Sequence, residues 1–173
     1  MKIAEEVARA ILETAANKAL PMKVGQGTAA VKVTNIEPGD RVVSWVSSNP
    51  SVVKVGKTNG KLKAQKKTGK AVITVTLASN KQIKFYVTVK KNQVKTRSVQ
   101  VAEKNLVLSR KKTAKLEAKV LPLTSQDKLT YVSSNSKVAS VNAKGIVKAK
   151  AKGVAKITVK SGSKKVVVKV TVK

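Results

Sequence analysis

The chain contains one sequence unit written twice. The segment Trp45-Val-Ser-Ser-Asn-Pro-Ser-Val-Val-Lys-Val returns as Tyr131-Val-Ser-Ser-Asn-Ser-Lys-Val-Ala-Ser-Val. Further along, Gly69-Lys-Ala-Val-Ile-Thr-Val matches Gly153-Val-Ala-Lys-Ile-Thr-Val. Each copy spans roughly 80 residues, which exceeds the period of a solenoid repeat and fits a small autonomous domain. The repeat therefore predicts two similar domains.

Each copy has the residue pattern of short β-strands. Apolar and polar residues alternate through most runs, as between Lys70 and Leu77, and Val, Ile and Thr dominate them. A period of two is typical of a strand with one buried face. Single glycines such as Gly60 and Gly145 separate the runs and mark turns. Many short strands with regular turns favour an antiparallel β-sandwich.

The repeated motifs resemble the bacterial immunoglobulin-like domain of group 2. Its pattern has an aromatic strand start, Ser-Ser-Asn-x-x-Val-Ala-x-Val, a turn glycine, Gly-x-Ala-x-Ile-Thr-Val and a final x-Val-x-Val-Thr-Val. The second copy carries nearly all of it from Tyr131 to Val172, whereas the first has Val53 where alanine is usual. The resemblance covers about residues 20–173. It implies a seven-stranded type of sandwich that serves as a spacer, display or adhesion module without catalytic residues.

The two copies begin differently. Residues 1–19 are rich in helix formers and predict an amphipathic helix with an apolar candidate docking face: Ile3, Val7, Ala10, Ile11 and Ala15. The second copy begins instead with a candidate strand at 95–102, so we expect the first domain to lack a usual first strand. The expected domains are the helix at 1–19, Ig-like domains at 20–90 and 95–173, and a linker at 91–94. The predicted fold class is all-β: two tandem Ig-like antiparallel β-sandwiches preceded by an N-terminal α-helix.

The predicted helix has two interpretations. It could pack on its own sandwich and cover the sheet edge left by the missing strand. Alternatively, its apolar face could bind a protein partner, namely a capsid, a tail or a second copy of the chain. An isolated helix of this length is marginal in water, so the apolar face must be buried somewhere.

The composition is strongly basic, with 37 Lys and Arg against 8 Asp and Glu and a formal net charge of +29. The predicted helix is neutral, so the excess lies on the two sandwiches. The alternating run 147–152 predicts a basic surface, whose candidates are Lys148, Lys150 and Lys152. Such a surface attracts polyanions, including acidic glycans on a bacterial surface. Arginine and aromatic residues are scarce, which argues against specific nucleic-acid recognition.

The side chains needed for catalysis are missing or scattered. The chain has no His and no Cys, and its eight carboxylates form no evident acid–base pair or metal cluster. The glycines fall singly, not in a phosphate-binding loop. We therefore expect a protein that is not an enzyme and has no metal or cofactor. No transmembrane segment is predicted either.

Two function classes fit these features. The first is a tailed-phage virion decoration or fibre-like protein on the virion exterior, docked by its N-terminal part and presenting a basic outer domain. It is favoured by Met1, by the absence of an export signal and by the expected missing strand. The alternative is a fragment of a bacterial cell-surface adhesin, extracellular, in which the domains act as spacers or bind acidic glycans. Attraction to polyanions is compatible with both.

Overall fold

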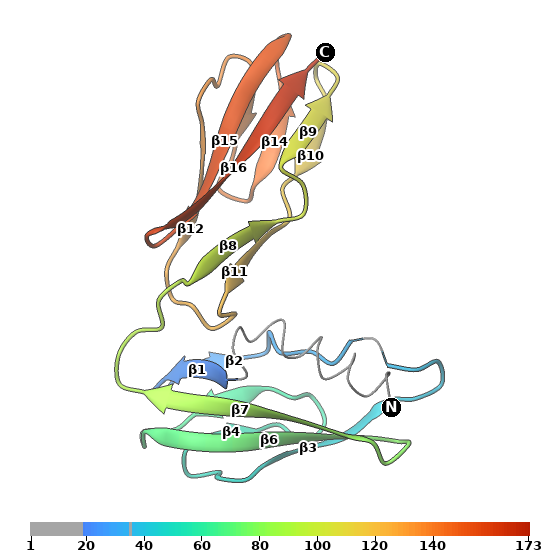
Figure 1. Ribbon diagram of the computed structural model, residues 1–173, viewed down its shortest axis with the longest axis vertical. Coiled ribbons are helices and arrows are strands. Elements are labelled where there is room, and N and C mark those ends of the chain that lie inside the picture. The colour runs from blue at the N-terminus through green and yellow to red at the C-terminus, as the bar shows by residue number, and fades with distance from the viewer. Residues whose placement is uncertain (1–18, 35) are drawn as a thin grey trace. The chain divides into compact units, whose positions relative to one another are not determined.

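The structure is a computed structural model that describes residues 19–34 and 36–173 (Figure 1). The described residues divide into two compact units, the first made of residues up to 94 together with Leu121–Ser125 and the second of residues 95–120 and 126–173. Each unit has its own hydrophobic core.

The first unit contains a four-stranded and a three-stranded sheet. The larger sheet has, in spatial order, β1 (Ala19–Lys23), β7 (Gln82–Lys90), β6 (Gly69–Leu77) and β3 (Val42–Ser47). The smaller sheet has the order β2 (Gly27–Thr28), β5 (Leu62–Ala64) and β4 (Val53–Val55). Strands β6 and β7 form an antiparallel hairpin, and β1 runs parallel to β7.

The second unit repeats both sheets in the same order. Its larger sheet has the order β9 (Asn105–Leu108), β16 (Lys164–Val172), β15 (Gly153–Ser161) and β12 (Leu129–Ser133). Its smaller sheet has the order β10 (Thr113–Lys115), β14 (Ile146–Ala149) and β13 (Ala139–Val141). An additional pair joins β8 (Ser98–Val101) and β11 (Ala118–Leu121). The sequence repeat is therefore also a structural repeat.

Alternation along the strands builds each core. In β6 every second side chain is buried, from Ala71 to Leu77, and β15 buries Ala155, Ile157 and Val159 at the matching positions. In the first core the rings of Trp45 and Phe85 meet edge to face at 6.4 Å. The other side chains of the same strands point outward and form the outer faces of the two larger sheets.

The expected fold class needs correction. Every regular element within residues 19–34 and 36–173 is a strand, so the described structure is all-β and contains no helix. The expected docking face of Ile3, Val7, Ala10, Ile11 and Ala15 lies outside the described residues, and Ala19, placed at the end of the helix, begins β1 instead. The larger sheets are also not purely antiparallel, because β1 and β9 each run parallel to their neighbour.

The described part of the first unit begins with β1, which takes the place of β9 in the larger sheet, and it has no counterpart of β8. In β1 the side chains of Leu20 and Met22 are buried, and Pro21 lies between them. The sequence interpretation placed a helix at 1–19, directly before this segment, but proline is tolerated in an edge strand, which needs fewer backbone donors. Strand β1 occupies the sheet edge beside β7. Strand β1 is then itself the edge strand of the sheet, and cover of that edge by the expected helix is a prediction about residues outside the described ones.

Candidate functional site

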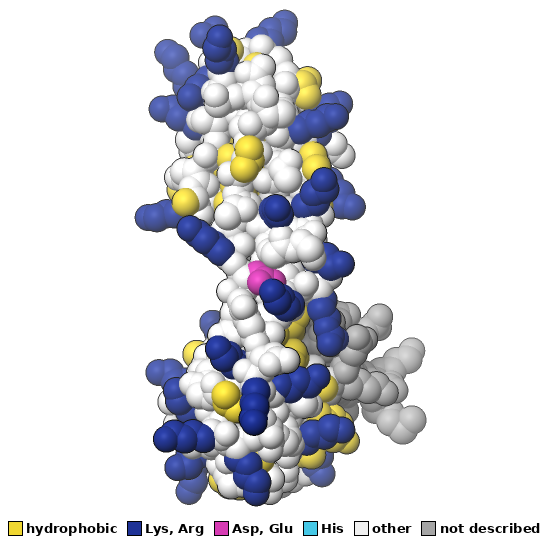
Figure 2. Space-filling view, turned by 90° about the vertical axis from the view of Figure 1, so that its left-hand side faces the viewer, with side chains coloured by type: hydrophobic (Ala, Val, Ile, Leu, Met, Phe, Trp, Pro, Cys, Tyr) yellow, Lys and Arg dark blue, Asp and Glu magenta, His cyan; other side chains and the backbone are white. Residues whose placement is uncertain are grey.

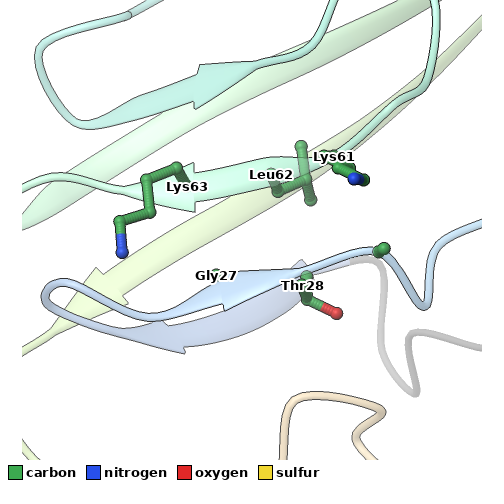
Figure 3. Close-up of a pocket in the computed structure, with 6 residues that line it drawn as sticks. Gly27, Thr28, Lys61, Leu62 and Lys63 are labelled. Carbon is green, nitrogen blue, oxygen red and sulfur yellow. The ribbon is translucent and has the colours of Figure 1, made fainter.

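A shallow, open hollow of about 430 Å³ lies beside β2 and β5 of the first unit (Figure 3). It is lined mainly by residues with small or basic side chains: Gly27, Thr28, Ala29, Lys61, Leu62 and Lys63. The Lys63 ammonium donates a hydrogen bond to the Gly25 carbonyl at 2.7 Å. The lining offers no carboxylate, imidazole or thiol, so the hollow suits electrostatic contact with an anion and not acid–base chemistry.

The repeated Ser-Ser-Asn segments organise turns. The Asn49 carboxamide accepts a hydrogen bond from Ser51, and the Asn135 carboxamide accepts one from the backbone N–H of Lys137. The hydroxyls of Ser48 and Ser134 accept hydrogen bonds from backbone N–H groups of β6 and β15. These polar side chains bind their own chain, which is typical of Asn and Ser side chains in turns.

The predicted basic residues do not share one strand. Lys148 lies on β14 with an exposed side chain, between Thr113 and Ser140 of the neighbouring strands. Strand β14 ends at Ala149, so Lys150 and Lys152 lie in the connection to β15. The alternating sequence continues beyond the strand that it predicts. These three lysines are exposed, but they do not form a single sheet face.

A more regular basic surface lies on the outer face of the larger sheet of the second unit. We call it the outer face, and its residues form four cross-strand rows. The first row is Val107, Thr171 and Val154, and the second is Asn105, Lys169 and Lys156. The third row is Val167, Thr158 and Val132, and the fourth is Lys165, Lys160 and Thr130. Rows of β-branched side chains thus alternate with rows that contain two lysines each.

The lysines of the outer face are paired directly across the β15–β16 hairpin. Lys156 lies opposite Lys169, and Lys160 lies opposite Lys165. The N–H of Lys156 donates to the Ser134 hydroxyl and that of Lys169 to the Lys104 carbonyl, so neither bonds across the hairpin. Side chains are closest in such non-hydrogen-bonded pairs. Like charges at directly opposite positions destabilise a sheet.

The hairpin of the first unit has other residues at the positions of these two pairs. There Val72 lies opposite Tyr86 and Thr76 opposite Gln82, at the positions that carry the two lysine pairs in the second unit. Across this hairpin lysine lies opposite threonine, as in the pair of Thr74 and Lys84, although Lys90 also lies opposite Lys23 of β1. The hairpin of the shared fold therefore does not require lysine opposite lysine.

Few carboxylates offset the basic side chains. Among the described residues, ion pairs join Lys81 to Glu37 at 2.8 Å and Lys115 to Glu117 at 3.3 Å. None of the four outer-face lysines forms an ion pair with a described residue. Figure 2 shows Lys and Arg side chains spread over the visible face of each unit, with little acidic surface. Both units consequently carry positive surface charge.

The family follows from the second unit. Residues 95–172 match the sequence profile described as bacterial Ig-like domain (group 2), and this segment has the β-sheets given above. This segment is a bacterial Ig-like domain of group 2. The match includes Tyr131 and the Ser-Ser-Asn turn, the features that suggested the family in the sequence.

Part of a known enzyme is similar to this chain. Kappa-carrageenase of Pseudoalteromonas carrageenovora is 42% identical over 80 residues, which make up 46% of this chain and 20% of that protein. The alignment therefore spans only a fifth of the carrageenase. Within the described residues, no group of three or more Asp, Glu, His or Cys side chains is arranged to hold a metal ion.

Solved structures with Ig-like domains align at low similarity. Domains 4 and 5 of the S-layer protein SbsC align over 75% of this chain and 69% of that chain, at 24% identity and a TM-score of 0.42. A C-terminal fragment of intimin, in complex with the intimin-binding domain of the translocated intimin receptor, aligns over 77% and 53% at 19% identity and a TM-score of 0.36. These values carry no information about partners.

The lysine pairs of the Ig-like domain had a detectable sequence signal that sequence reasoning missed. The sequence Ser161-Gly162-Ser163 has the composition of a tight turn, and in the structure Ser161 pairs with Lys164 around the two residues Gly162 and Ser163. A two-residue hairpin turn fixes the register of its strands. Applying that register would have placed Lys160 opposite Lys165.

No helix of the described residues has the length and apolar character needed to cross a membrane.

Proposed function

We propose that this chain is a non-catalytic, extracellular module of a bacterial surface or secreted protein that binds acidic glycans. The supporting observation is the large excess of exposed lysine over carboxylate on a family of domains expected to act as spacers and adhesion modules. Such a surface concentrates polyanions near the protein and accelerates their association.

A glycan is favoured over a nucleic acid by the side chains available. The sequence has four arginines, at positions 9, 41, 97 and 110, so the bidentate donor for phosphates and guanine edges is scarce. Tyr86 is the one large aromatic side chain in the described residues that is strongly exposed. Binding of single strands commonly relies on several stacked bases, which this surface does not provide.

The surface-protein interpretation is preferred to the virion interpretation. The relatives named above are a carrageenase, a surface-layer protein and intimin, and no virion protein is among them. The expected lack of a usual first strand, one reason for the virion interpretation, stays a prediction, because β1 takes the place of β9 and the described part of the first unit has no counterpart of β8. Docking of a protein partner through Ile3, Val7, Ala10, Ile11 and Ala15 is a prediction about residues outside the described ones.

Similarity to the carrageenase suggests a suitable probe. We expect the full chain to bind kappa-carrageenan, a sulfated galactan, and to bind its desulfated counterpart much more weakly. Binding should weaken steeply with salt, because the screening length falls from about 10 Å at 0.1 M to about 3 Å at 1 M. Calorimetric titration of both polymers at two salt concentrations tests this. Equal binding of the sulfated and desulfated polymers, or none of either, would refute acidic-glycan binding.

A further inference from the structure

We propose that the outer face of the second unit is the principal glycan-binding surface, and that it binds an extended sulfated polysaccharide across its two lysine pairs. This inference rests on the proposed function and adds the location and the form of the ligand. The pairs Lys156–Lys169 and Lys160–Lys165 are the anion-binding positions. The row of Val167, Thr158 and Val132 lies between them.

The electrostatics of the hairpin identify these pairs. Two ammonium groups at directly opposite, non-hydrogen-bonded positions repel each other, and no described carboxylate relieves the repulsion through an ion pair. A sulfate group bound between the two lysines would remove that repulsion. The charge-assisted contacts would add to binding. Binding of a sulfate would thus relieve a lysine–lysine repulsion that destabilises the free second unit.

The internal repeat supplies a comparison within one chain. The first unit has the same hairpin but places Val72 opposite Tyr86 and Thr76 opposite Gln82. The hairpin therefore forms without lysine at these positions. The first unit places lysine opposite lysine elsewhere, at Lys23–Lys90 and Lys54–Lys63, but only once on each of those strand pairs. Binding of a polyanion would account for two lysine pairs on one hairpin face.

The geometry suits an extended polymer. The two lysine pairs are four residues apart along both strands, which corresponds to about 13–14 Å. Between and beside them lie exposed valines, with Val132 exposed to 62% and Val107 to 57%. Sugar rings present apolar C–H faces between their charged substituents, so alternating apolar and cationic rows match both parts of a sulfated chain. Thr158 and Thr171 add hydroxyls for hydrogen bonds to sugar hydroxyls.

Other occupants fit less well. A second copy of the chain would bring a strongly positive surface against another, which is repulsive. Duplex DNA is read by elements that enter a groove, and the four rows of the outer face carry neither arginine nor aromatic side chains. We therefore propose the sulfated polysaccharide as the ligand of the outer face, and DNA serves as a comparison in the test.

The test uses the full chain and variants that each lose two positive charges. The outer-face variants are Lys156→Thr with Lys169→Thr, and Lys160→Thr with Lys165→Thr. Threonine suits strands and occurs at neighbouring positions of the same face. The control is Lys137→Thr with Lys144→Thr, which removes two exposed lysines from turns of the same unit. A competing variant, Lys148→Thr with Lys150→Thr, tests the basic surface predicted from sequence.

We expect each outer-face variant to bind kappa-carrageenan about 10-fold more weakly, as for the loss of one or two charge-assisted contacts. The control should change affinity by less than about 3-fold, as for the loss of exposed, screened charges. Thermal unfolding should show that all variants fold, with outer-face midpoints unchanged or raised because the repulsion is gone.

Failure of the inference is separable from failure of the proposed function. If the wild-type protein binds the sulfated polymer but all four double variants bind it more weakly by the same factor, the outer face is not the site. Acidic-glycan binding by the chain then still stands. A larger loss for Lys148→Thr with Lys150→Thr would also overturn the inference. If the wild-type protein bound duplex DNA as tightly as kappa-carrageenan, and the outer-face variants weakened both by the same factor, the choice of a glycan would be wrong. Absence of wild-type binding to the sulfated polymer would refute the proposed function itself.

Discussion

The indole ring of Trp45 lies directly over the Cα of Gly60, so closely that a Cβ built on Gly60 would be 2.6 Å from ring atom Cε2. Gly60 also has a φ of +64°, which side chains rarely adopt. The second unit repeats the relationship, because a Cβ on Gly145 would be 2.8 Å from Tyr131 Cζ. An aromatic residue and a glycine from distant parts of the sequence are therefore one packing unit in both copies.

This packing predicts the cost of adding a methyl group. Gly60→Ala should destabilise the first unit by about 2–5 kcal/mol, the sum of backbone strain and overpacking. Gly25→Ala is the matched control, because Gly25 has a φ of +75° but nothing within 4 Å of a built Cβ. It should cost only about 1–2 kcal/mol. Urea unfolding of both variants measures the difference, and equal losses would contradict the role of the ring.

The lysine pairs predict a stabilising substitution. Lys169→Glu places a carboxylate opposite Lys156 and should stabilise the second unit by about 0.2–1 kcal/mol. Lys148→Glu causes the same change in net charge but lies between Thr113 and Ser140, so it should stabilise less. Thermal unfolding at low salt compares the two. A greater gain for Lys148→Glu would show that net charge, and not the cross-strand pair, controls stability.

Asp40 predicts a local dependence on acid pH. The hydrogen bond from the Ser79 hydroxyl is the main cause that holds the pKa of Asp40 below 3.8, opposed by desolvation and assisted by backbone N–H groups of Arg41 and Ser79 and by the charge of Lys81. Because the folded pKa is depressed, its stabilising effect is present above pH 3.8 and is lost as pH falls through the folded value.

Removing that hydroxyl should shift the titration. In Ser79→Ala the pKa of Asp40 should move upward toward 3.8, as followed by the NMR shift of the carboxyl carbon. Ser51→Ala removes a hydroxyl that bonds Asn49 and should leave the Asp40 titration unchanged. An unchanged Asp40 titration in Ser79→Ala would show that the backbone contacts are sufficient.

Tyr131 predicts a change at alkaline pH. Burial is the main cause that raises its pKa above 10.0, with Lys115 lowering it and Glu117 raising it. Its stabilising effect is therefore complete below pH 10.0 and is lost as pH rises through the folded pKa. In a Tyr86→Phe background, ultraviolet absorbance of the phenolate should appear at higher pH in the folded chain than in urea. If the phenolate appeared at the same pH in the folded chain and in urea, burial would not be raising the pKa of Tyr131.

Strand β1 predicts a cost for truncating a residue that was assigned near the end of a helix. Leu20 is 1% exposed, so Leu20→Ala should destabilise the first unit by about 2–5 kcal/mol. Lys23→Ala, at the partly exposed end of the same strand, should change stability much less. Denaturant unfolding measures both, and a neutral Leu20→Ala would be inconsistent with the observed parallel pairing of β1 and β7.

The sequence was sufficient for features that depend on local periodicity. Alternation identifies Ala155, Ile157 and Val159 as inward-facing, because successive side chains of a strand point to opposite faces. The repeat predicted two units of the same fold, and the motifs around Tyr131 predicted the Ig-like family. These features require no knowledge of which strands become neighbours.

Only the tertiary structure decided which strands lie side by side. The parallel pairing of β1 with β7 joins segments far apart in sequence, and the sequence interpretation gave a helix up to residue 19 without a strand after it. The same limit applies to the basic surface, where alternation through Lys152 continued beyond the strand end at Ala149. Lys156 and Lys169 become neighbours only through hairpin register. Periodicity is a property of one strand, whereas register and strand order depend on contacts between strands.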